Sequence, residues 1–372
     1  MSLRSAPLDG VRALAVVAVL LYHAHYSWAV GGYLGVDVFF VLSGYLITGV
    51  LLSTHRSFWG YRQFLVRRAV RLVPALVVAM TGVTVVSLAT SMGAPTARCG
   101  AASLGYVMNL PFAEHLGCPA MWHITWSLAA EQQFYLLWPL LLATLALVLR
   151  RLRPESLAGR GHGLAVAAVV CLAAYAVEVC WQLVARVQGG VVTAELAYGP
   201  GGRCLVLLVG CSLALWRAAR RAAHRPDRAT GSASVVLASV AALVWCFVTG
   251  ALGSDLKALV PLVVVGVASL ALVSALLRSP TTSVAARVLG ARPVAWLGRV
   301  SYSLYLWHEV AYRLAETVAP RGTPVAEVLR FSLALLFAAA SHRWVEQPSQ
   351  RWWAARRTRQ EDVDERVLVP TS

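Results

Sequence analysis

The sequence predicts an all-α protein, a polytopic bundle of membrane-spanning helices. Of its 372 residues, 58% are hydrophobic and only 13% are charged, and the mean hydropathy is +0.65. Soluble domains carry roughly 25% charged residues, so this composition excludes a soluble enzyme, a disordered chain and a disulfide scaffold. The net charge of +16 would suggest nucleic acid in a soluble protein. In a membrane protein arginine-rich loops have a topological cause, so we expect no nucleic-acid partner.

About ten segments are apolar enough to cross a bilayer, which takes roughly 20 residues each. The first segment has no cleavage pattern of a signal peptide, so we expect it to remain as a helix. The sixth segment is short. The expected spans are 11–30, 34–54, 73–92, 126–149, 163–184, 202–217, 233–252, 258–277, 294–312 and 325–345.

The loops between these spans predict the orientation. One side of the membrane receives 23 arginines, and the other side receives five basic residues. Because cytoplasmic loops are enriched in Lys and Arg, both termini are expected in the cytoplasm. We therefore expect a membrane domain over 1–348, in contact with the lipid bilayer, and a cytoplasmic tail over 349–372. The sequence leaves the oligomeric state open.

The first span carries two ionisable residues, Arg12 and His23, and such residues inside a membrane are functional candidates. Eleven residues of helix bring them to the same face, about 16 Å apart along the axis. A cation near the cytoplasmic end and an imidazole at mid-membrane suit an anionic substrate that enters from the cytoplasm. Alternatively, Arg12 extends to the lipid headgroups and His23 hydrogen-bonds a neighbouring helix.

Asp37 lies near the outer end of the second span. A carboxylate there would orient His23 by accepting its second ring proton. It would equally stabilise the helix N-terminus with no part in catalysis. Position alone slightly favours the second role.

A cluster of arginines precedes the third span, in the string FLVRRAVRLVP over 64–74. Arg67 and Arg71 are four residues apart and are neighbours on a helix, with Arg68 beside them. Guanidinium groups bind phosphates through two parallel hydrogen bonds, so this cluster predicts a site for a phosphorylated or CoA-like donor. The alternative is an ordinary basic anchor on the cytoplasmic side, next to Pro74 at the start of the span.

Two further spans carry polar residues at helical spacing. In the fourth span, Ser127 and Glu131 are four residues apart and face the same way, and Glu131 is a candidate for positioning a ligand. In the ninth span, Ser301, Tyr305 and His308 form a stripe that we expect to face the bundle interior.

Cys99 and Cys118 fall in the longest loop that the charge pattern places outside the cytoplasm. Disulfides persist in that compartment, so we expect a bond between them. The other five cysteines lie in expected spans and are expected to be small buried apolar residues. There is no CxxC pair and no HExxH or phosphate-loop motif, so we expect no metal site.

Six strings occur in series along nearly the whole chain: LDGVRALAVVAVLLYH, GVDVFFVLSGYLIT, RRAVRLVP, WSLAAEQQFY, GRVSYSLYLWH and WVEQP. Together they resemble the integral-membrane acyltransferase 3 family, which includes bacterial glycan and macrolide O-acyltransferases. Arg12 and His23 match the family's arginine and histidine pair, and its carboxylate falls on Glu131. This chain has Gln132 where relatives often have a second glutamate, preceded by Ala130 in place of the usual residue.

The resemblance implies an enzyme of the bacterial cell membrane that moves a short acyl group, such as acetyl, from acyl-CoA to a hydroxyl. The acceptor would be a sugar, a glycan or a glycosylated natural product such as a macrolide. His23 would act as general base. The alternative is a covalent acyl-histidine step, which nothing in the sequence requires. No bound cofactor is expected, because acyl-CoA is a substrate. Many relatives carry an additional C-terminal esterase-like domain, and we expect none within these 372 residues.

The expected site residues form two groups. His23, Asp37 and Glu131 are the catalytic candidates, and the donor and substrate would bind to the residues Arg12, Arg67, Arg68, Arg71, Tyr305 and His308. The alternative function is a transporter or flippase of a lipid-linked or anionic small molecule, which would use the same polar residues as a pathway. An enzyme releases free CoA, whereas a carrier does not.

Overall fold

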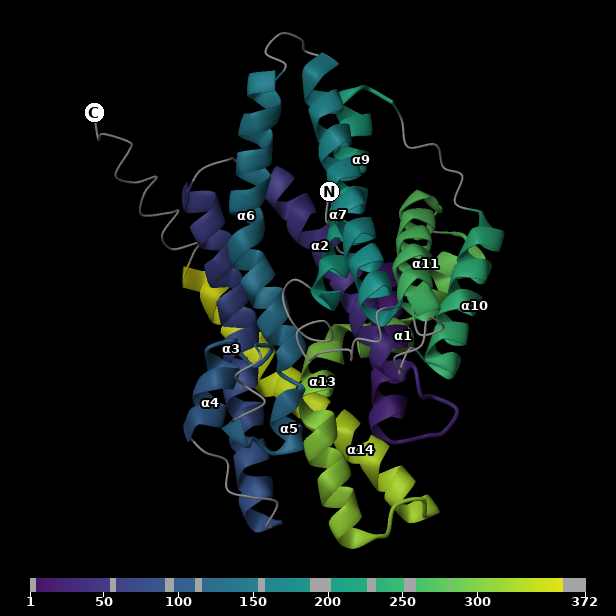
Figure 1. The fold of residues 1–372 in the computed structure, drawn as a ribbon. Coiled ribbons are helices and arrows are strands. Elements are labelled where there is room, and N and C mark those ends of the chain that lie inside the picture. The colour runs from purple at the N-terminus through teal and green to yellow at the C-terminus, as the bar shows by residue number, and fades with distance from the viewer. Residues whose placement is uncertain are drawn as a thin grey trace, which may run out of the picture. The chain divides into compact units, whose positions relative to one another are not determined.

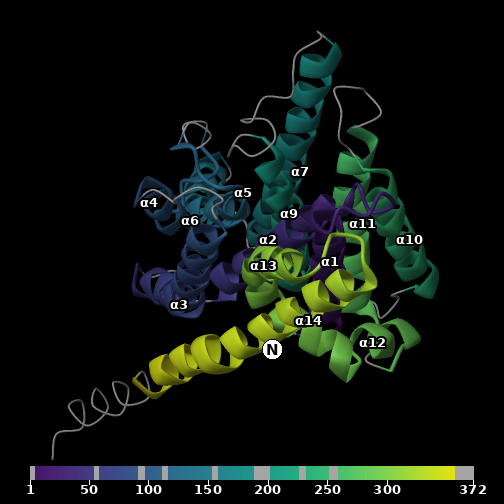
Figure 2. The same cartoon turned by 90° about the horizontal axis from the view of Figure 1, so that it is seen from below.

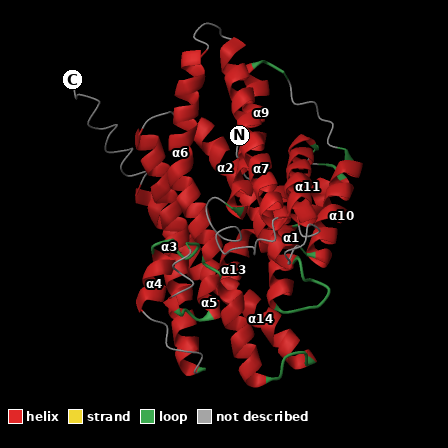
Figure 3. Cartoon of the chain, in the orientation of Figure 1, coloured by secondary structure: helices red, strands yellow, loops and turns green. Residues whose placement is uncertain are grey.

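The computed structural model has the predicted all-helical fold. Among the residues it describes, every regular element is a helix and no strand occurs (Figures 1 and 3). Part of the expected cytoplasmic tail, 349–356, is helical, and the rest of that tail lies outside the described residues. The structure describes 5–53, 58–90, 97–110, 116–152, 158–187, 202–225, 232–250, 259–280 and 282–356.

The chain divides into two compact units. The first comprises 1–56 and 96–301, and the second comprises 57–95 and 302–372, so that helix α13 contributes to both. The second unit contains α3 (Phe58–Ala89), the later part of α13 (Arg292–Val318), α14 (Pro324–Ser341) and the π-helical turn η5 (His342–Glu346). The first unit contains α1 (Ala6–His23), η1 (Gly32–Leu34), α2 (Gly35–Ser53), α4 (Ala97–Leu104), α5 (Ala120–His123), α6 (Trp126–Leu152), α7 (Ala158–Val187), η3 (Arg203–Val206), α9 (Leu207–Ala222), α10 (Ala233–Thr249), α11 (Leu259–Arg278) and α12 (Val284–Leu289).

Each expected span overlaps a helix, but the count of ten is not confirmed. Seven helical segments of the described chain are long and apolar enough to cross a membrane. Helix α10 is apolar but shorter, while α9 and α13 do not meet the same criterion. The seven candidates are Ala6–His23, Gly32–Ser53, Gly60–Ala89, Met121–Leu149, Gly161–Ala185, Val260–Arg278 and Pro324–Arg356, the last of which appears as one long run of helix in Figure 2.

The first helix differs from the expected span of 11–30. It begins at Ala6, with Pro7 and Asp9 in the first turn, both of which favour a helix N-terminus. It ends at His23, because His25 adopts a left-handed conformation with φ of 61° that ends the helical path. The prediction that His23 lies in the middle of a span is therefore wrong, since it is the last residue of α1.

Two glycines bring α2 and α9 into close contact within the first unit. A Cβ atom at Gly44 would overlap the carbonyl oxygen of Leu207, and one at Gly210 would overlap the carbonyl oxygen of Val41. Small residues at facing positions allow two membrane helices to pack backbone against backbone. This crossing fixes the position of α2, which carries Ser43 beside Gly44.

Helix α3 runs without interruption through Pro74. Its 32 residues correspond to about 48 Å, well beyond the roughly 30 Å of a bilayer core. The helix itself does not begin at Pro74, because the preceding arginines and the apolar segment belong to a single helix, and the entry into the membrane at Pro74 stays a prediction. Arg67, Arg68 and Arg71 therefore lie in the N-terminal half of one long helix.

Candidate active site

His23 ends α1 with its imidazole ring fixed by the backbone. Its Nδ1 atom lies 2.9 Å from the carbonyl oxygen of Val19, one turn earlier. A carbonyl only accepts hydrogen bonds, so Nδ1 carries the proton and Nε2 carries the lone pair in the neutral ring. The ring of Tyr22 packs edge-on against the imidazole at 5.0 Å between centroids, and His23 is partly exposed. This is the tautomer and the access that a general base requires.

Asp37 is buried in the first turn of α2, with only 1% of its surface exposed. The Nδ1 proton of His23 is donated to Val19, so the ring is oriented at that nitrogen by a backbone carbonyl. A carboxylate in the first turn also interacts favourably with the positive end of the helix dipole. The catalytic role of Asp37 stays a prediction.

Arg12 is held by two neighbouring helices of the first unit. Its Nη2 donates to Ser301 Oγ at 3.1 Å, and its Nε lies 3.3 Å from the carbonyl oxygen of Gly298, both on α13. The guanidinium carbon lies 5.5 Å from the centre of the Phe39 ring on α2, within range of a cation–π interaction. These contacts hold the guanidinium group against the bundle, about 16 Å along α1 from His23.

Glu131 lies in a line of polar contacts between α2 and α6. Ser43 Oγ donates to Glu131 Oε1 at 2.7 Å, and the Tyr135 hydroxyl donates to Oε2 at 2.9 Å. Further along, Trp138 Nε1 donates to Thr48 Oγ1 at 2.9 Å. We call these five residues the α2–α6 seam. Sequence reasoning missed the other four members, although Glu131, Tyr135 and Trp138 are spaced at i, i+4 and i+7.

The polar stripe of α13 is buried, as its spacing predicted, with Ser301, Tyr305 and His308 at 1%, 7% and 0% exposed. His308 Nδ1 lies 2.7 Å from the carbonyl oxygen of Tyr305, so this ring also carries its proton on Nδ1. Its Nε2 lies 3.6 Å from Glu309 Oε1, and the Tyr312 ring packs edge-on against it. Glu309 was not among the residues predicted from the sequence.

The three candidate donor-binding arginines lie along one side of α3 in the second unit. Arg67 is exposed, and its Nη2 donates to Gln63 Oε1 at 2.7 Å. Arg68 and Arg71 are half-buried and three residues apart, so they share a face of the helix. The predicted site residues thus form two sets, with Arg12, His23, Asp37 and Glu131 in the first unit and the three arginines, Tyr305 and His308 in the second.

One intramembrane carboxylate was overlooked. Glu178 lies in α7 within the span of 163–184 and is 7% exposed. Gln182 Nε2, one turn later, donates to its Oε1 at 2.9 Å. Its position in the middle of an apolar run was itself the signal, since ionisable residues are rare in spans.

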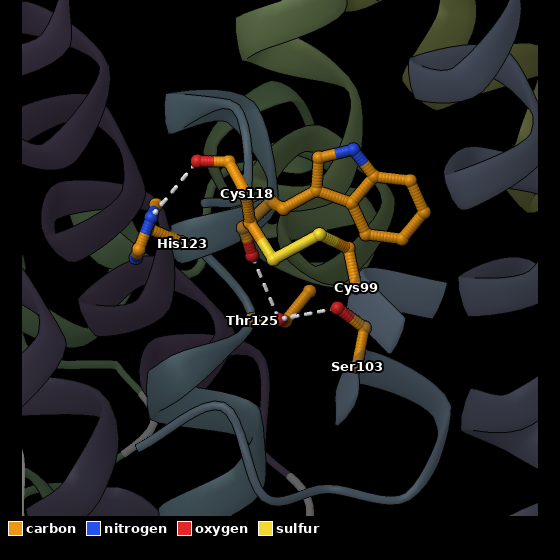
Figure 4. Close-up of a disulfide and its surroundings, with 6 residues drawn as sticks. Cys99, Ser103, Cys118, His123 and Thr125 are labelled. Atoms are coloured by element: carbon orange, nitrogen blue, oxygen red, sulfur yellow. Dashed lines mark hydrogen bonds between the residues drawn. A yellow bond between two sulfur atoms is a disulfide. The ribbon is translucent and has the colours of Figure 1, made fainter. Parts of the chain in front are cut away.

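The predicted disulfide is confirmed. Cys99 and Cys118 are bonded, with their Cα atoms 5.7 Å apart, and the bond joins α4 to the segment before α5 (Figure 4). His123 Nε2 lies 3.3 Å from the Cys118 carbonyl, and Thr125 links Ser103 to Trp122 through hydrogen bonds of 3.1 and 2.8 Å. Of the five free cysteines, four are buried as expected, whereas Cys180 is exposed.

The helices and the polar residues they bury define the class of this protein. Residues 6–343 match the family described as acyltransferase domain, which is nearly the whole chain. The chain therefore belongs to this acyltransferase family, and with its apolar helices it is an integral membrane protein. The family resemblance inferred from the six strings is confirmed. No solved structure matches the chain.

Similar proteins have related names. A putative peptidoglycan O-acetyltransferase, YrhL of Bacillus subtilis strain 168, is 32% identical over 358 residues, which cover 92% of this chain and 54% of that protein. Peptidoglycan O-acetyltransferase OatA of Listeria monocytogenes is 31% identical, over 92% of this chain and 55% of its own length. A putative O-acetyltransferase of Staphylococcus aureus strain COL, SACOL0978, is 26% identical, over 92% and 57% respectively. The chain thus spans about half the length of these relatives.

Proposed function

We propose that the protein transfers an acetyl group from acetyl-CoA to a hydroxyl of a cell-envelope glycan, in a bacterial cell membrane. The acyltransferase family and the relatives named as peptidoglycan O-acetyltransferases support this reaction class and this acceptor. The observation that carries the chemistry is the hydrogen bond from His23 Nδ1 to Val19, because it leaves the lone pair of the neutral ring on Nε2.

In the proposed reaction Nε2 of His23 takes the proton of the acceptor hydroxyl. The oxygen forms a bond to the thioester carbonyl carbon, the carbon–sulfur bond breaks, and CoA leaves as a thiolate that accepts a proton from the imidazolium. General-base assistance of this kind contributes about 100- to 10,000-fold to a rate. The Val19 contact stabilises the imidazolium as well, since Nδ1–H remains a donor throughout.

The donor would be held by Arg67, Arg68 and Arg71, whose guanidinium groups are suited to the phosphates of CoA. Arg12 would contribute a second positive charge, on the first unit. Glu131 would position either the acceptor or helices α2 and α6, through the α2–α6 seam. Asp37 would alter the electrostatic potential near the outer end of α2. Tyr305 and His308 would provide buried polar groups for substrate binding.

The test uses the purified full chain in lipid nanodiscs, with acetyl-CoA and either a peptidoglycan fragment or a glycosylated macrolide as acceptor. Free CoA is measured with a thiol reagent, and the acetylated product by mass spectrometry. We expect equimolar CoA and acetylated glycan, and a loss of roughly 100-fold or more in His23→Ala. His25→Asn is the matched control, because His25 is exposed and Asn tolerates its left-handed backbone.

Three results would overturn the proposal. Turnover in His23→Ala within about threefold of the parent removes the base from His23. Acetylation of the macrolide with no reaction of the glycan changes the acceptor class. With the protein in sealed lipid vesicles, movement of a substrate across the bilayer without any release of CoA would favour the carrier over the enzyme.

A further inference from the structure

The helix that carries the donor arginines has a weak point directly after them. Pro74 has no N–H to donate to the carbonyl of Val70, so α3 lacks one helical hydrogen bond within a turn of Arg71. A helix weakened in this way needs other contacts to keep one geometry at that point. Contacts within the second unit supply them.

The first contact comes from Tyr302 on α13. Its hydroxyl donates to the carbonyl oxygen of Leu72 at 2.9 Å, and Leu72 is the residue that follows Arg71. Tyr302 is only 7% exposed, so this bond is shielded from water. It ties the backbone of α3 to α13 between the arginines and Pro74.

The second contact begins at the next residue of α13. Ser303 Oγ donates to Glu346 Oε1 and forms a hydrogen bond with Ser341 Oγ at 3.0 Å. The other carboxylate oxygen of Glu346 lies 3.2 Å from His342 Nδ1. Glu346 is completely buried, and a buried carboxylate is tolerated only when such polar partners surround it.

His342 and Glu346 are the first and last residues of the π-helical turn η5, which packs against α3. Single π-turns inside helices are uncommon and are frequent at functional sites. Two neighbouring residues of α13 therefore reach two different elements: Tyr302 holds α3 directly, and Ser303 holds the turn that packs on α3. Through these two routes α13 supports the segment that carries Arg68 and Arg71.

We propose that Tyr302 and Glu346 are positioning residues for the donor: they fix α3 around Pro74 so that the arginines are already arranged for the phosphates of CoA. The proposal rests on the assignment of Arg67, Arg68 and Arg71 as donor-binding residues. A preformed arginine cluster loses less conformational freedom when the donor binds. Tyr302 and Glu346 touch neither the donor nor the acceptor in this account, so they affect donor binding and leave the chemical step unchanged.

The test measures CoA binding by calorimetry, and kcat and KM for acetyl-CoA, on the full chain in nanodiscs. Tyr302→Phe removes only the hydroxyl, and we expect CoA affinity to fall about 3- to 10-fold with kcat within about twofold. Glu346→Ala should weaken binding similarly, and Glu346→Gln, which keeps an acceptor for Ser303, should restore most of it. Tyr175→Phe is the matched control, because the Tyr175 hydroxyl also donates to a carbonyl on another helix, Leu262 of α11, at 3.1 Å.

The outcomes separate this inference from the proposed function. If Arg67→Ala with Arg71→Ala leaves CoA affinity unchanged, the donor site itself is wrong. If that double variant loses affinity while Tyr302→Phe and Glu346→Ala both keep it, the positioning role alone is refuted. An equal loss in Tyr175→Phe, or a loss of kcat without a change in KM, also refutes it. Tyr302→Phe keeps the test decisive if Glu346→Ala does not fold.

Discussion

The sharpest stability prediction concerns Arg330, a guanidinium group buried between two carboxylates. Arg330 is 1% exposed. Its Nη2 lies 2.9 Å from Glu316 Oε1, and its Nη1 lies 2.8 Å from Glu327 Oε1. The Tyr312 ring lies 5.7 Å from the guanidinium carbon. Together these contacts join the end of α13 to the start of α14.

Replacing Arg330 by Met keeps most of the side-chain volume and removes the charge. Removal of one partner from a buried ion pair costs about 3 to 5 kcal/mol, because the remaining charges lose their compensation. Glu316 keeps Arg313 at 3.1 Å and Arg321 at 2.7 Å, so most of the cost comes from the two lost charge-assisted bonds. We therefore expect Arg330→Met near the lower end of that range.

Arg321 provides a matched control on the same oxygen atom. It also binds Glu316 Oε1, at the shorter distance of 2.7 Å, but its side chain is 45% exposed. An exposed ion pair contributes about 1 kcal/mol or less, so Arg321→Met should cost far less than Arg330→Met despite the similar geometry. Burial, and not distance, sets the difference.

The assay is reversible unfolding in mixed micelles by titration with sodium dodecyl sulfate, followed by circular dichroism. A cost of about 3 kcal/mol corresponds to a change of more than 100-fold in the unfolding equilibrium constant. The reasoning is refuted if Arg321→Met is as costly as Arg330→Met, or if Arg330→Met costs less than about 1 kcal/mol. A double-mutant cycle with Glu316→Gln then isolates the coupling.

The same network predicts a pH dependence. Burial raises the pKa of the Glu316 carboxyl, but the hydrogen bond and charge of Arg321, together with Arg313 and Arg330, lower it by more. The pKa of Glu316 therefore lies below its usual value of 4.5. The stabilisation by the ionised carboxylate is therefore complete above pH 4.5 and is lost as the pH falls through the folded-state pKa. Thermal melts between pH 3 and 6 measure this loss, and Glu316→Gln should abolish the pH dependence. Gly210→Ala should destabilise the protein by about 1 to 3 kcal/mol, because the new methyl group forces α9 away from Val41. Gly163→Ala on α7, with open space around it, should not destabilise at all, and equal losses would refute the packing argument. Alkylation of the unfolded protein without reduction should modify the free cysteines, such as Cys180, and spare Cys99 and Cys118, whose bond closes a loop of about 20 residues and contributes roughly 3 kcal/mol, whereas labelling of both would disprove the bond.

The sequence predicted what depends on local composition. Apolar runs located a helix at each expected span, helical spacing predicted the burial of Ser301, Tyr305 and His308, and the two loop cysteines predicted their bond. These features follow from hydropathy and from the period of the helix. Contacts such as Ser43 with Glu131, 88 residues apart, depend on which helices pack together, and no local pattern specifies that.

The misplaced end of α1 has a specific physical cause. Residues 24–30 are apolar enough to extend the first span, yet they form a loop of which only part packs on protein, while His25, Ser27, Trp28 and Val30 are exposed. Ala24 and Ala29 are buried, and the Gly31 N–H donates to the carbonyl of Phe247 on α10 at 2.8 Å. Hydropathy records that a segment avoids water, and it does not distinguish burial against lipid from burial against another helix.

The same ambiguity acts in the opposite direction on α13. This helix fails the criterion of apolarity because charged residues occur along it, including Arg299, Glu309 and Glu316. Much of its polarity is satisfied by protein: Ser301 accepts from Arg12, Ser303 pairs with Glu346, and His308 Nδ1 bonds the Tyr305 carbonyl. A helix surrounded by others can carry polar groups at little cost when each has a partner, since only its lipid-facing surface must be apolar. The polarity of α13, which places it below the limit for a membrane span, is therefore a consequence of its contacts with Arg12 and with the turn η5.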